Sequence, residues 1–152
     1  MPQITGGTTE VTITLDLSAL GASLNALGNA TVTGTVATFP ITGGSTSSTG
    51  DLIEHNGSGL RITGTNPTTT VDTQNYLVNT GSEVVNADVS INGASQGNLG
   101  LFTLGSSGLS NVPLTLTSSA VTTINTAFGL SGMNALTTST PIGTLTSSPI
   151  VK

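Results

Sequence analysis

Charged side chains are scarce in this sequence. Of its 152 residues, only two are Lys or Arg, seven are Asp or Glu, one is His and none is Cys. General acid–base catalysis and zinc binding draw mainly on these residue types. The composition therefore predicts a protein that is not an enzyme, with no catalytic residues and no metal site.

The scarcity of basic residues also narrows the possible partners. The net charge is −5, and the acidic residues are spread singly along the chain. A nucleic-acid-binding surface normally shows clustered Lys and Arg. A membrane-spanning helix needs about 18 or more consecutive apolar residues, and no segment of this length is present. We expect neither nucleic-acid binding nor membrane insertion.

The near-absence of lysine indicates the location of the protein. Charged residues make up 6% of the chain, against about 25% in an average soluble domain. In their place the sequence has 30 threonines, 18 serines and 20 glycines. A surface rich in hydroxyls and poor in charge is typical of secreted bacterial surface proteins, and we therefore expect an extracellular or cell-surface location.

The residues that are present favour β-structure. The apolar set is mainly Leu, Ile, Val and Ala, with three Phe and one Tyr, and β-branched residues suit pleated, half-buried surfaces. Apolar and polar residues alternate in short segments separated by Gly- and Asn-containing turns. We predict an all-β fold: an antiparallel β-sandwich or barrel of about eight strands with one or two short helices. A flexible N-terminal arm, residues 1–7, would precede a single β domain, residues 8–152.

The expected elements follow from local periodicity. Helices are predicted at 18–28, from Leu20, Leu24 and Leu27, and at 119–128, which would end at Gly129. A hairpin is predicted around 56–59, where Asn-Gly favours a tight turn. The predicted strands are 8–17, 30–41, 51–55, 60–64, 68–78, 83–91, 98–104, 111–117 and 141–150.

The leading functional hypothesis is a self-assembling structural subunit of a filament, pilus-like fibre or surface layer. Its partners would be copies of itself, joined when one chain adds a strand to the sheet edge of the next. The candidate donor strand carries the apolar side chains Val11, Ile13, Leu15 and Leu17. The same strand can equally pair within its own chain, and the sequence leaves both pairings open.

Local motifs add little evidence for chemistry. Gly93–Gly97 matches the Gly-x-Ser-x-Gly pattern around Ser95, but a strand rather than a helix is expected after it, so Ser95 is not predicted to be a nucleophile. His55, at the tip of the predicted hairpin, has none of the partner side chains that a zinc site requires.

A second hypothesis comes from the order of features between residues 50 and 146. The segments are Ile53–Leu60, Asn66-Pro67, Val84–Val89, Leu114–Thr117 with the helix through Gly129, and Pro141–Gly143. In this order they resemble the HtaA-type domain of bacterial haem-binding surface proteins.

That resemblance implies a secreted haem- or other ligand-binding module. Domains of this family hold haem through a tyrosine supported by a histidine, and His55 lies where the histidine is expected. The tyrosine is not matched, because segment 18–28 contains none and the only tyrosine is Tyr76. Under this alternative His55 and Tyr76 are the candidate ligand-binding residues and haem is the cofactor; otherwise no cofactor is expected. An ice-binding domain, suggested by the regularly spaced Thr31, Thr33 and Thr35 and by Thr115 and Thr117, is a further alternative, and so is an adhesin domain.

Overall fold

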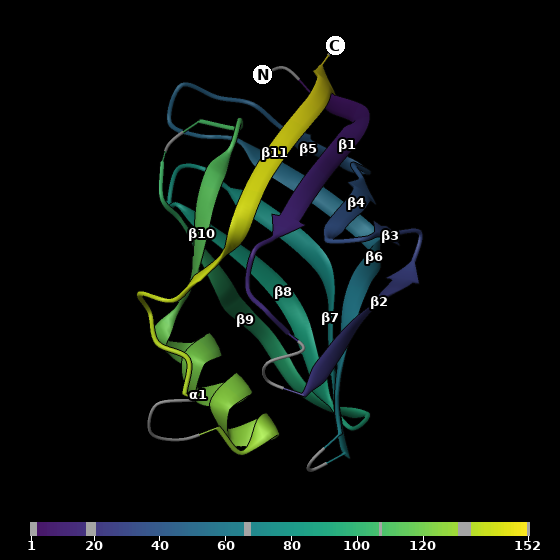
Figure 1. The fold of residues 1–152 in the computed structure, drawn as a ribbon. Coiled ribbons are helices and arrows are strands. Elements are labelled where there is room, and N and C mark those ends of the chain that lie inside the picture. Colours follow the sequence, from purple (N-terminus) through teal and green to yellow (C-terminus); the bar gives the residue numbers. More distant parts are fainter. Residues whose placement is uncertain (1–2, 18–20, 66–67, 107, 131–134, 152) are drawn as a thin grey trace.

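The fold is an 11-stranded antiparallel sheet with one described helix (Figure 1). The structure is a computed structural model, and it describes residues 3–17, 21–65, 68–106, 108–130 and 135–151. The elements are β1 (Ile4–Ile13), β2 (Ala22–Gly28), β3 (Thr31–Thr33), β4 (Val36–Pro40), β5 (Gly43–Ser45), β6 (Leu52–Thr65), β7 (Thr68–Asn79), β8 (Val84–Ile91), β9 (Ala94–Leu104), β10 (Val112–Leu116), α1 (Ser118–Phe128) and β11 (Pro141–Val151).

The sheet curls into a nearly closed barrel. Its strand order is β2-β6-β7-β8-β9-β10-β11-β1-β4-β3, and β5 pairs with β6. The two ends of this order approach each other beside β5. The Ile41 N–H, just after β4, donates to the Gly7 carbonyl on β1 (3.0 Å), and the Thr42 N–H donates to the Glu54 carbonyl on β6 (2.8 Å). Gln3, just before β1, also forms an isolated antiparallel bridge with Ser45 on β5. The predicted all-β antiparallel fold is confirmed, with more strands than the eight expected.

Strand β1 lies inside the sheet and has a partner on each edge. It pairs antiparallel with β11, Val11 opposite Leu145, and with β4, Val11 opposite Ala37. It begins at Ile4, within the segment predicted to be a flexible arm. Both rows of its backbone hydrogen-bonding groups are therefore used within the chain.

The interior of the barrel is aliphatic, and α1 covers one end of it (Figure 1). Helix α1 begins after Thr117, whose side chain accepts a hydrogen bond from the Ala120 N–H (3.1 Å). It ends at Gly129, which takes the left-handed conformation that glycine adopts without strain. The predicted second helix is thus confirmed, one residue earlier at its start. It buries Ala120 and Ile124 against the barrel.

The first predicted helix, 18–28, is wrong where the structure describes it. Residues 22–28 form β2, which pairs with β6 so that Leu24 lies opposite Ile62; residues 18–20 lie outside the described residues. In this segment Ala22, Leu24 and Ala26 also alternate with other residues, so it can present an apolar inward face as a strand and not only as a helix. Pairing with the edge of β6 decides between the two patterns, because sheet pairing overrides a weak local helix preference.

Two other expected boundaries differ. Strands 51–55 and 60–64 are one strand, β6, because the register shifts between His55 and Gly59 and so absorbs the Asn-Gly pair as a bulge. His55 is therefore in mid-strand and not at a hairpin tip. The expected strand 30–41 is divided into β3 and β4 by a turn at Gly34, where φ is +62°.

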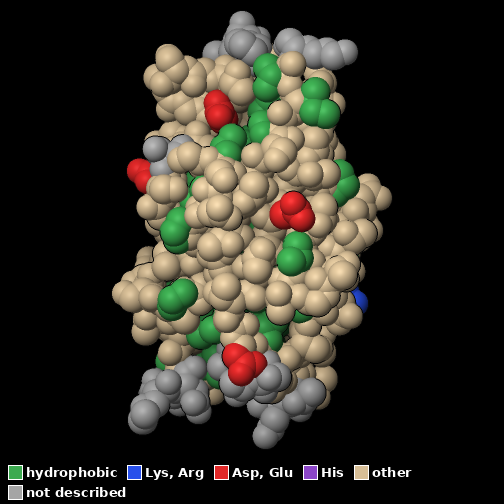
Figure 2. Space-filling model, turned by 45° about the horizontal axis from the view of Figure 1, so that its top comes forward, with side chains coloured by type: hydrophobic (Ala, Val, Ile, Leu, Met, Phe, Trp, Pro, Cys, Tyr) green, Lys and Arg blue, Asp and Glu red, His purple; other side chains and the backbone are tan. Residues whose placement is uncertain are grey.

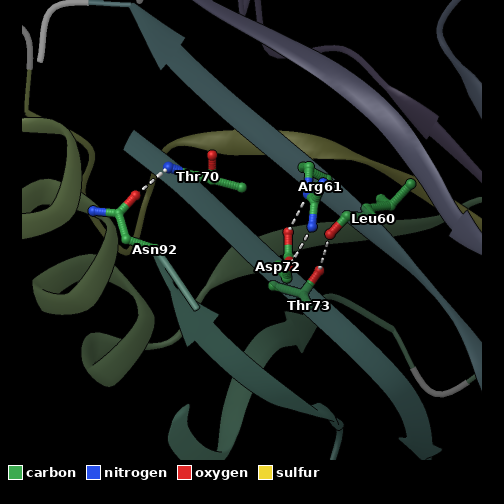
Figure 3. Close-up of polar contacts among 6 residues, drawn as sticks. All are labelled: Leu60, Arg61, Thr70, Asp72, Thr73 and Asn92. Atoms are coloured by element: carbon green, nitrogen blue, oxygen red, sulfur yellow. Dashed lines mark hydrogen bonds and ion pairs between the residues drawn. The ribbon is translucent and has the colours of Figure 1, made fainter. Parts of the chain in front are cut away.

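The outer surface is largely uncharged. On the face drawn in Figure 2, acidic side chains stand singly and apolar side chains are scattered among hydroxyl- and amide-bearing residues. The one described ion pair joins Arg61 on β6 to Asp72 on β7, with 2.8 Å between Nε and Oδ1 (Figure 3). Across the described residues, no helix combines the length and the apolar character that crossing a bilayer requires.

Candidate functional site: a buried polar line and an apolar cavity

His55 is buried in the barrel and makes two hydrogen bonds. Its side chain is 1% exposed. Nδ1 lies 3.0 Å from the Tyr76 carbonyl oxygen and Nε2 lies 2.7 Å from Thr9 Oγ1. A carbonyl only accepts hydrogen bonds, so the proton is assigned to Nδ1, and Nε2 accepts from the Thr9 hydroxyl. Both ring nitrogens of His55 are thus occupied by protein groups.

The hydroxyl of Thr9 extends this contact to a third strand. Ser147 Oγ lies 2.8 Å from Thr9 Oγ1, and the two residues face each other across the β1–β11 pair. Since Thr9 donates to His55, it accepts from Ser147. Thr9 and Ser147 are 2% and 6% exposed. A buried polar line, Ser147–Thr9–His55–Tyr76 carbonyl, therefore joins β11, β1, β6 and β7.

Tyr76 is fixed in a different direction from His55. The two residues are opposite each other in the β6–β7 register, but the Tyr76 phenol hydrogen-bonds the Thr73 hydroxyl, which donates to the Leu60 carbonyl (Figure 3). The Tyr76 ring contacts Phe39 edge to face at 5.0 Å between centroids. Burial raises the pKa of the Tyr76 phenol, so the phenol is neutral near pH 7.

This network predicts that acid destabilises the fold. Burial lowers the pKa of His55, and the hydrogen bond to the Tyr76 carbonyl opposes that shift. The unfolded chain, with a His pKa of about 6.5, then binds a proton before the folded one does. The stability that neutral His55 contributes is present above about pH 6.5 and is lost as pH falls toward the folded pKa, by at most about 1.4 kcal/mol per pH unit. Urea unfolding at pH 7.5 and pH 5.5 measures this loss of stability. Between the two pH values, the free energy of unfolding should fall more for the wild type than for His55→Leu. Equal decreases would contradict a buried, neutral His55.

Beside this line lies an apolar cavity of about 70 Å³ that is partly open to the outside. Its walls come from β1, β2, β6, β7, β9, β10, β11, α1 and the segments after β1 and before β11. Among the described residues that line it, none is charged. The predicted apolar residues Leu15 and Leu17 reach it from beyond the end of β1, and Ile124 and Phe128 reach it from α1. Of the described residues in this lining, Thr73 and Tyr76 are the two that contribute polar groups. The cavity suits an uncharged, apolar guest.

A second cavity of about 20 Å³ adjoins the first. It is bounded by the polar line and by Phe39, and it shares Ile13, Leu60, Tyr76 and Phe102 with the larger cavity. The polar line is complete, because no buried side-chain nitrogen or oxygen among the described residues lacks a partner. The same residues contain no group of three or more His, Cys, Asp or Glu side chains that could hold a metal ion.

Comparison with solved structures identifies the fold. The chain is similar to the C-terminal domain of HtaA from Corynebacterium glutamicum, with a TM-score of 0.70, 13% identity and 100% of both chains covered. It is also similar to the haem-binding protein HtaB from the same organism, with a TM-score of 0.54, 16% identity and full coverage of both chains. No family model and no curated protein matched the sequence. The HtaA-type resemblance is thus confirmed as a likeness of fold.

The filament hypothesis is wrong. The two solved structures compared above are described as an HtaA domain and a haem-binding protein, and neither description names a filament subunit. The four proposed donor side chains are also in use: Val11 and Ile13 lie on β1, paired on both edges, and Leu15 and Leu17 line the larger cavity. A filament, pilus-like fibre or surface layer built by donating this strand would remove the strand from its own barrel.

Sequence reasoning found His55 and Tyr76 but missed their partners. Thr9 and Ser147 are buried, and strand alternation could have identified both residues as inward-facing. Thr9 is two residues before Val11 and Ser147 is two residues after Leu145, so each lies on the inward face of its strand. Ser95 lies exposed on β9, and strand follows it, as the sequence predicts.

Proposed function

We propose that this chain is an extracellular, non-enzymatic module that binds a small, largely apolar molecule in the cavity beneath α1. The observation that carries the proposal is the apolar cavity itself, whose described lining is uncharged and comes from ten elements and segments of the barrel. Two further facts support it: the fold resembles that of HtaB, a haem-binding protein, and the chain is poor in residues that perform acid–base chemistry.

Haem is the ligand that the likeness to HtaB suggests, and the described residues do not fit it. Both nitrogens of His55 and the phenol of Tyr76 are held by protein groups. The cavities, about 70 and 20 Å³, are well below the roughly 300–1,000 Å³ of typical ligand sites. We therefore propose a ligand smaller than haem, bound through apolar contact and without axial ligation by His55 or Tyr76.

A ligand can occupy the cavity only if some of the side chains that line it move. An apolar cavity of roughly 150 Å³ admits benzene in another protein, so a ligand here must displace side chains such as those of Ile124 and Phe128. Burial contributes about 0.8 kcal/mol per methylene, which offsets such displacement only for a ligand that is apolar over most of its surface. Selectivity for apolar, uncharged molecules follows.

A fluorescence titration with the neutral probe N-phenyl-1-naphthylamine tests the proposal. Ala22 lines the cavity, whereas Ala26, four residues farther along the same face of β2, is not among its lining residues. Ala22→Leu should fill part of the cavity and weaken probe binding by about tenfold, while the matched control Ala26→Leu should bind like the wild type.

Equal probe affinity in both variants, or no saturable binding by the wild type, would contradict the cavity as the binding site. Haemin is titrated in parallel. A Soret shift lost in His55→Leu or Tyr76→Phe, in a protein that remains folded, would replace the proposed ligand class by haem.

A further inference from the structure

A second, separate recess lies on the outside of the barrel. It is an open groove of about 440 Å³ over β6, β7, β8 and β9, which is within the range of roughly 300–1,000 Å³ found for ligand sites. His55, Tyr76 and Ala87 on these strands point inward and are buried, so their neighbours point outward. The groove is lined by Glu54, Asn56, Asn75, Leu77, Asp88 and Asn98, with Tyr76 beneath.

The centre of the groove is a carboxylate held by two amides. Asn75 Nδ2 donates to Asp88 Oδ2 (3.0 Å) and Asn98 Nδ2 donates to Asp88 Oδ1 (3.1 Å). These two hydrogen bonds lower the pKa of Asp88, so its carboxylate is ionised at neutral pH. The three side chains come from β7, β8 and β9 and are fixed relative to one another.

The amide oxygens at this centre are already occupied. Asn75 Oδ1 accepts from the Gly57 N–H (2.9 Å) and Asn98 Oδ1 accepts from Asn86 Nδ2 (3.3 Å). A bound cation would therefore meet amide N–H groups beside the carboxylate, which is unfavourable for calcium because calcium requires six to eight oxygen ligands. The second N–H of each amide and the remaining lone pairs of the Asp88 carboxylate are available for hydrogen bonds to a ligand.

Two further side chains add hydrogen-bonding capacity. Glu54 and Asn56 are exposed on β6, and within the described part of the chain neither side chain has a hydrogen-bond partner. Leu77, half-buried between them and Asp88, gives the groove an apolar patch. Donors and acceptors that alternate beside an apolar patch match a ligand with several hydroxyls and an apolar C–H face, because a hydroxyl both donates and accepts.

The backbone holds this arrangement in place. The register shifts between His55 and Gly59 on β6 and between Gln74 and Leu77 on β7, so two bulges lie side by side at the groove. Asn75, within the second bulge, has φ of +56°, a conformation that non-glycine residues seldom adopt within strands. Bulges re-aim side chains and are frequent beside binding sites.

From this groove we infer a binding site for a neutral saccharide. The carboxylates of Glu54 and Asp88 exclude anionic ligands by repulsion, and the occupied amide oxygens disfavour a cation. Asp88, Asn75 and Asn98 hydrogen-bond the sugar hydroxyls, and Leu77 packs against a C–H face. The site is outside the barrel, so it does not depend on the apolar cavity beneath α1.

Two-dimensional ¹⁵N–¹H NMR of the whole chain, with cellobiose and maltose added separately at millimolar concentration, tests this inference. Saturable shifts of the backbone amides of residues 54–56, 75–77, 88 and 98 are expected with at least one disaccharide. Asn98→Leu should raise the dissociation constant about tenfold. Gln96→Leu, on the same strand but outside the groove, should leave it unchanged, and the rest of each spectrum reports folding.

The inference is overturned if neither disaccharide shifts these amides, or if Asn98→Leu and Gln96→Leu bind equally. Shifts produced by calcium chloride and not by the sugars would also overturn it, in favour of a cation site. Binding of N-phenyl-1-naphthylamine to the same sample is measured separately, so a failure here is distinguishable from a failure of the cavity proposal.

Discussion

Replacing His55 with alanine is expected to lower the free energy of unfolding by about 4 kcal/mol. The side chain is 1% exposed and bonds both the Tyr76 carbonyl and the Thr9 hydroxyl. Its removal leaves a cavity and takes a hydrogen-bond partner from each of these buried groups, and Thr9 also contacts Ser147. The substitution therefore weakens the whole buried polar line, which joins four strands.

Urea unfolding followed by far-ultraviolet circular dichroism measures this effect. The matched control is Glu54→Ala, one residue earlier on β6, whose side chain is exposed and which should change stability by less than about 0.5 kcal/mol. A loss below about 1 kcal/mol for His55→Ala would mean that the polar line contributes little to the fold, contrary to the argument from burial.

The other large expected effect concerns Gly143, where β11 passes β1. A Cβ atom at this position would lie 2.0 Å from the Thr12 carbonyl oxygen and 3.2 Å from the Ile13 Cα. Both neighbours are backbone atoms of the paired strand, which cannot move without shifting the register of β1 against β11. Gly143→Ala should therefore destabilise the fold by about 3 kcal/mol.

Gly108→Ala provides the comparison, because a Cβ there meets nothing within 4 Å, and its stability should stay within about 0.5 kcal/mol of the wild type. Urea unfolding midpoints of the wild type and of both variants are compared at two protein concentrations. A wild-type midpoint that rose with concentration, together with an unaffected Gly143→Ala variant, would contradict the pairing of β1 within its own chain.

Much of the fold follows from local pattern. The alternation from Val84 to Ile91 and the spacing of Val121, Ile124 and Phe128 before Gly129 each identify an element correctly. The predictions for these segments are correct because their periodicity fits one kind of element and because turn or cap residues stand at their ends. Element type is thus predictable where the pattern is unambiguous.

The errors occur where two patterns compete. Residues 22–28 suit a short amphipathic helix and an alternating strand alike, and only the free edge of β6 favours the strand. The Asn56-Gly57 pair suits a hairpin turn, but pairing of β6 with β7 on both sides of it makes it a bulge. These outcomes depend on contacts between distant segments, which local periodicity does not contain.

The candidate site was predictable only in part. The HtaA-type resemblance selected His55, which lies where that family has a histidine, and Tyr76, which is the only tyrosine. Their partners are common residue types, Thr9 and Ser147 among them, and the apolar cavity arises where ten elements and segments meet. Neither residue rarity nor spacing identifies such a site, because its members are ordinary core residues until the barrel brings them together.

The most direct test of the proposed function locates the ligand. Intermolecular nuclear Overhauser effects are measured between bound N-phenyl-1-naphthylamine and the methyl groups of the protein. Contacts to Leu24, Ile62 and Ile124, which line the cavity beneath α1, are the predicted result. Contacts confined to the exposed apolar side chains Leu52, Ile150 and Val151, or no contacts at all, would contradict an apolar ligand bound inside the barrel.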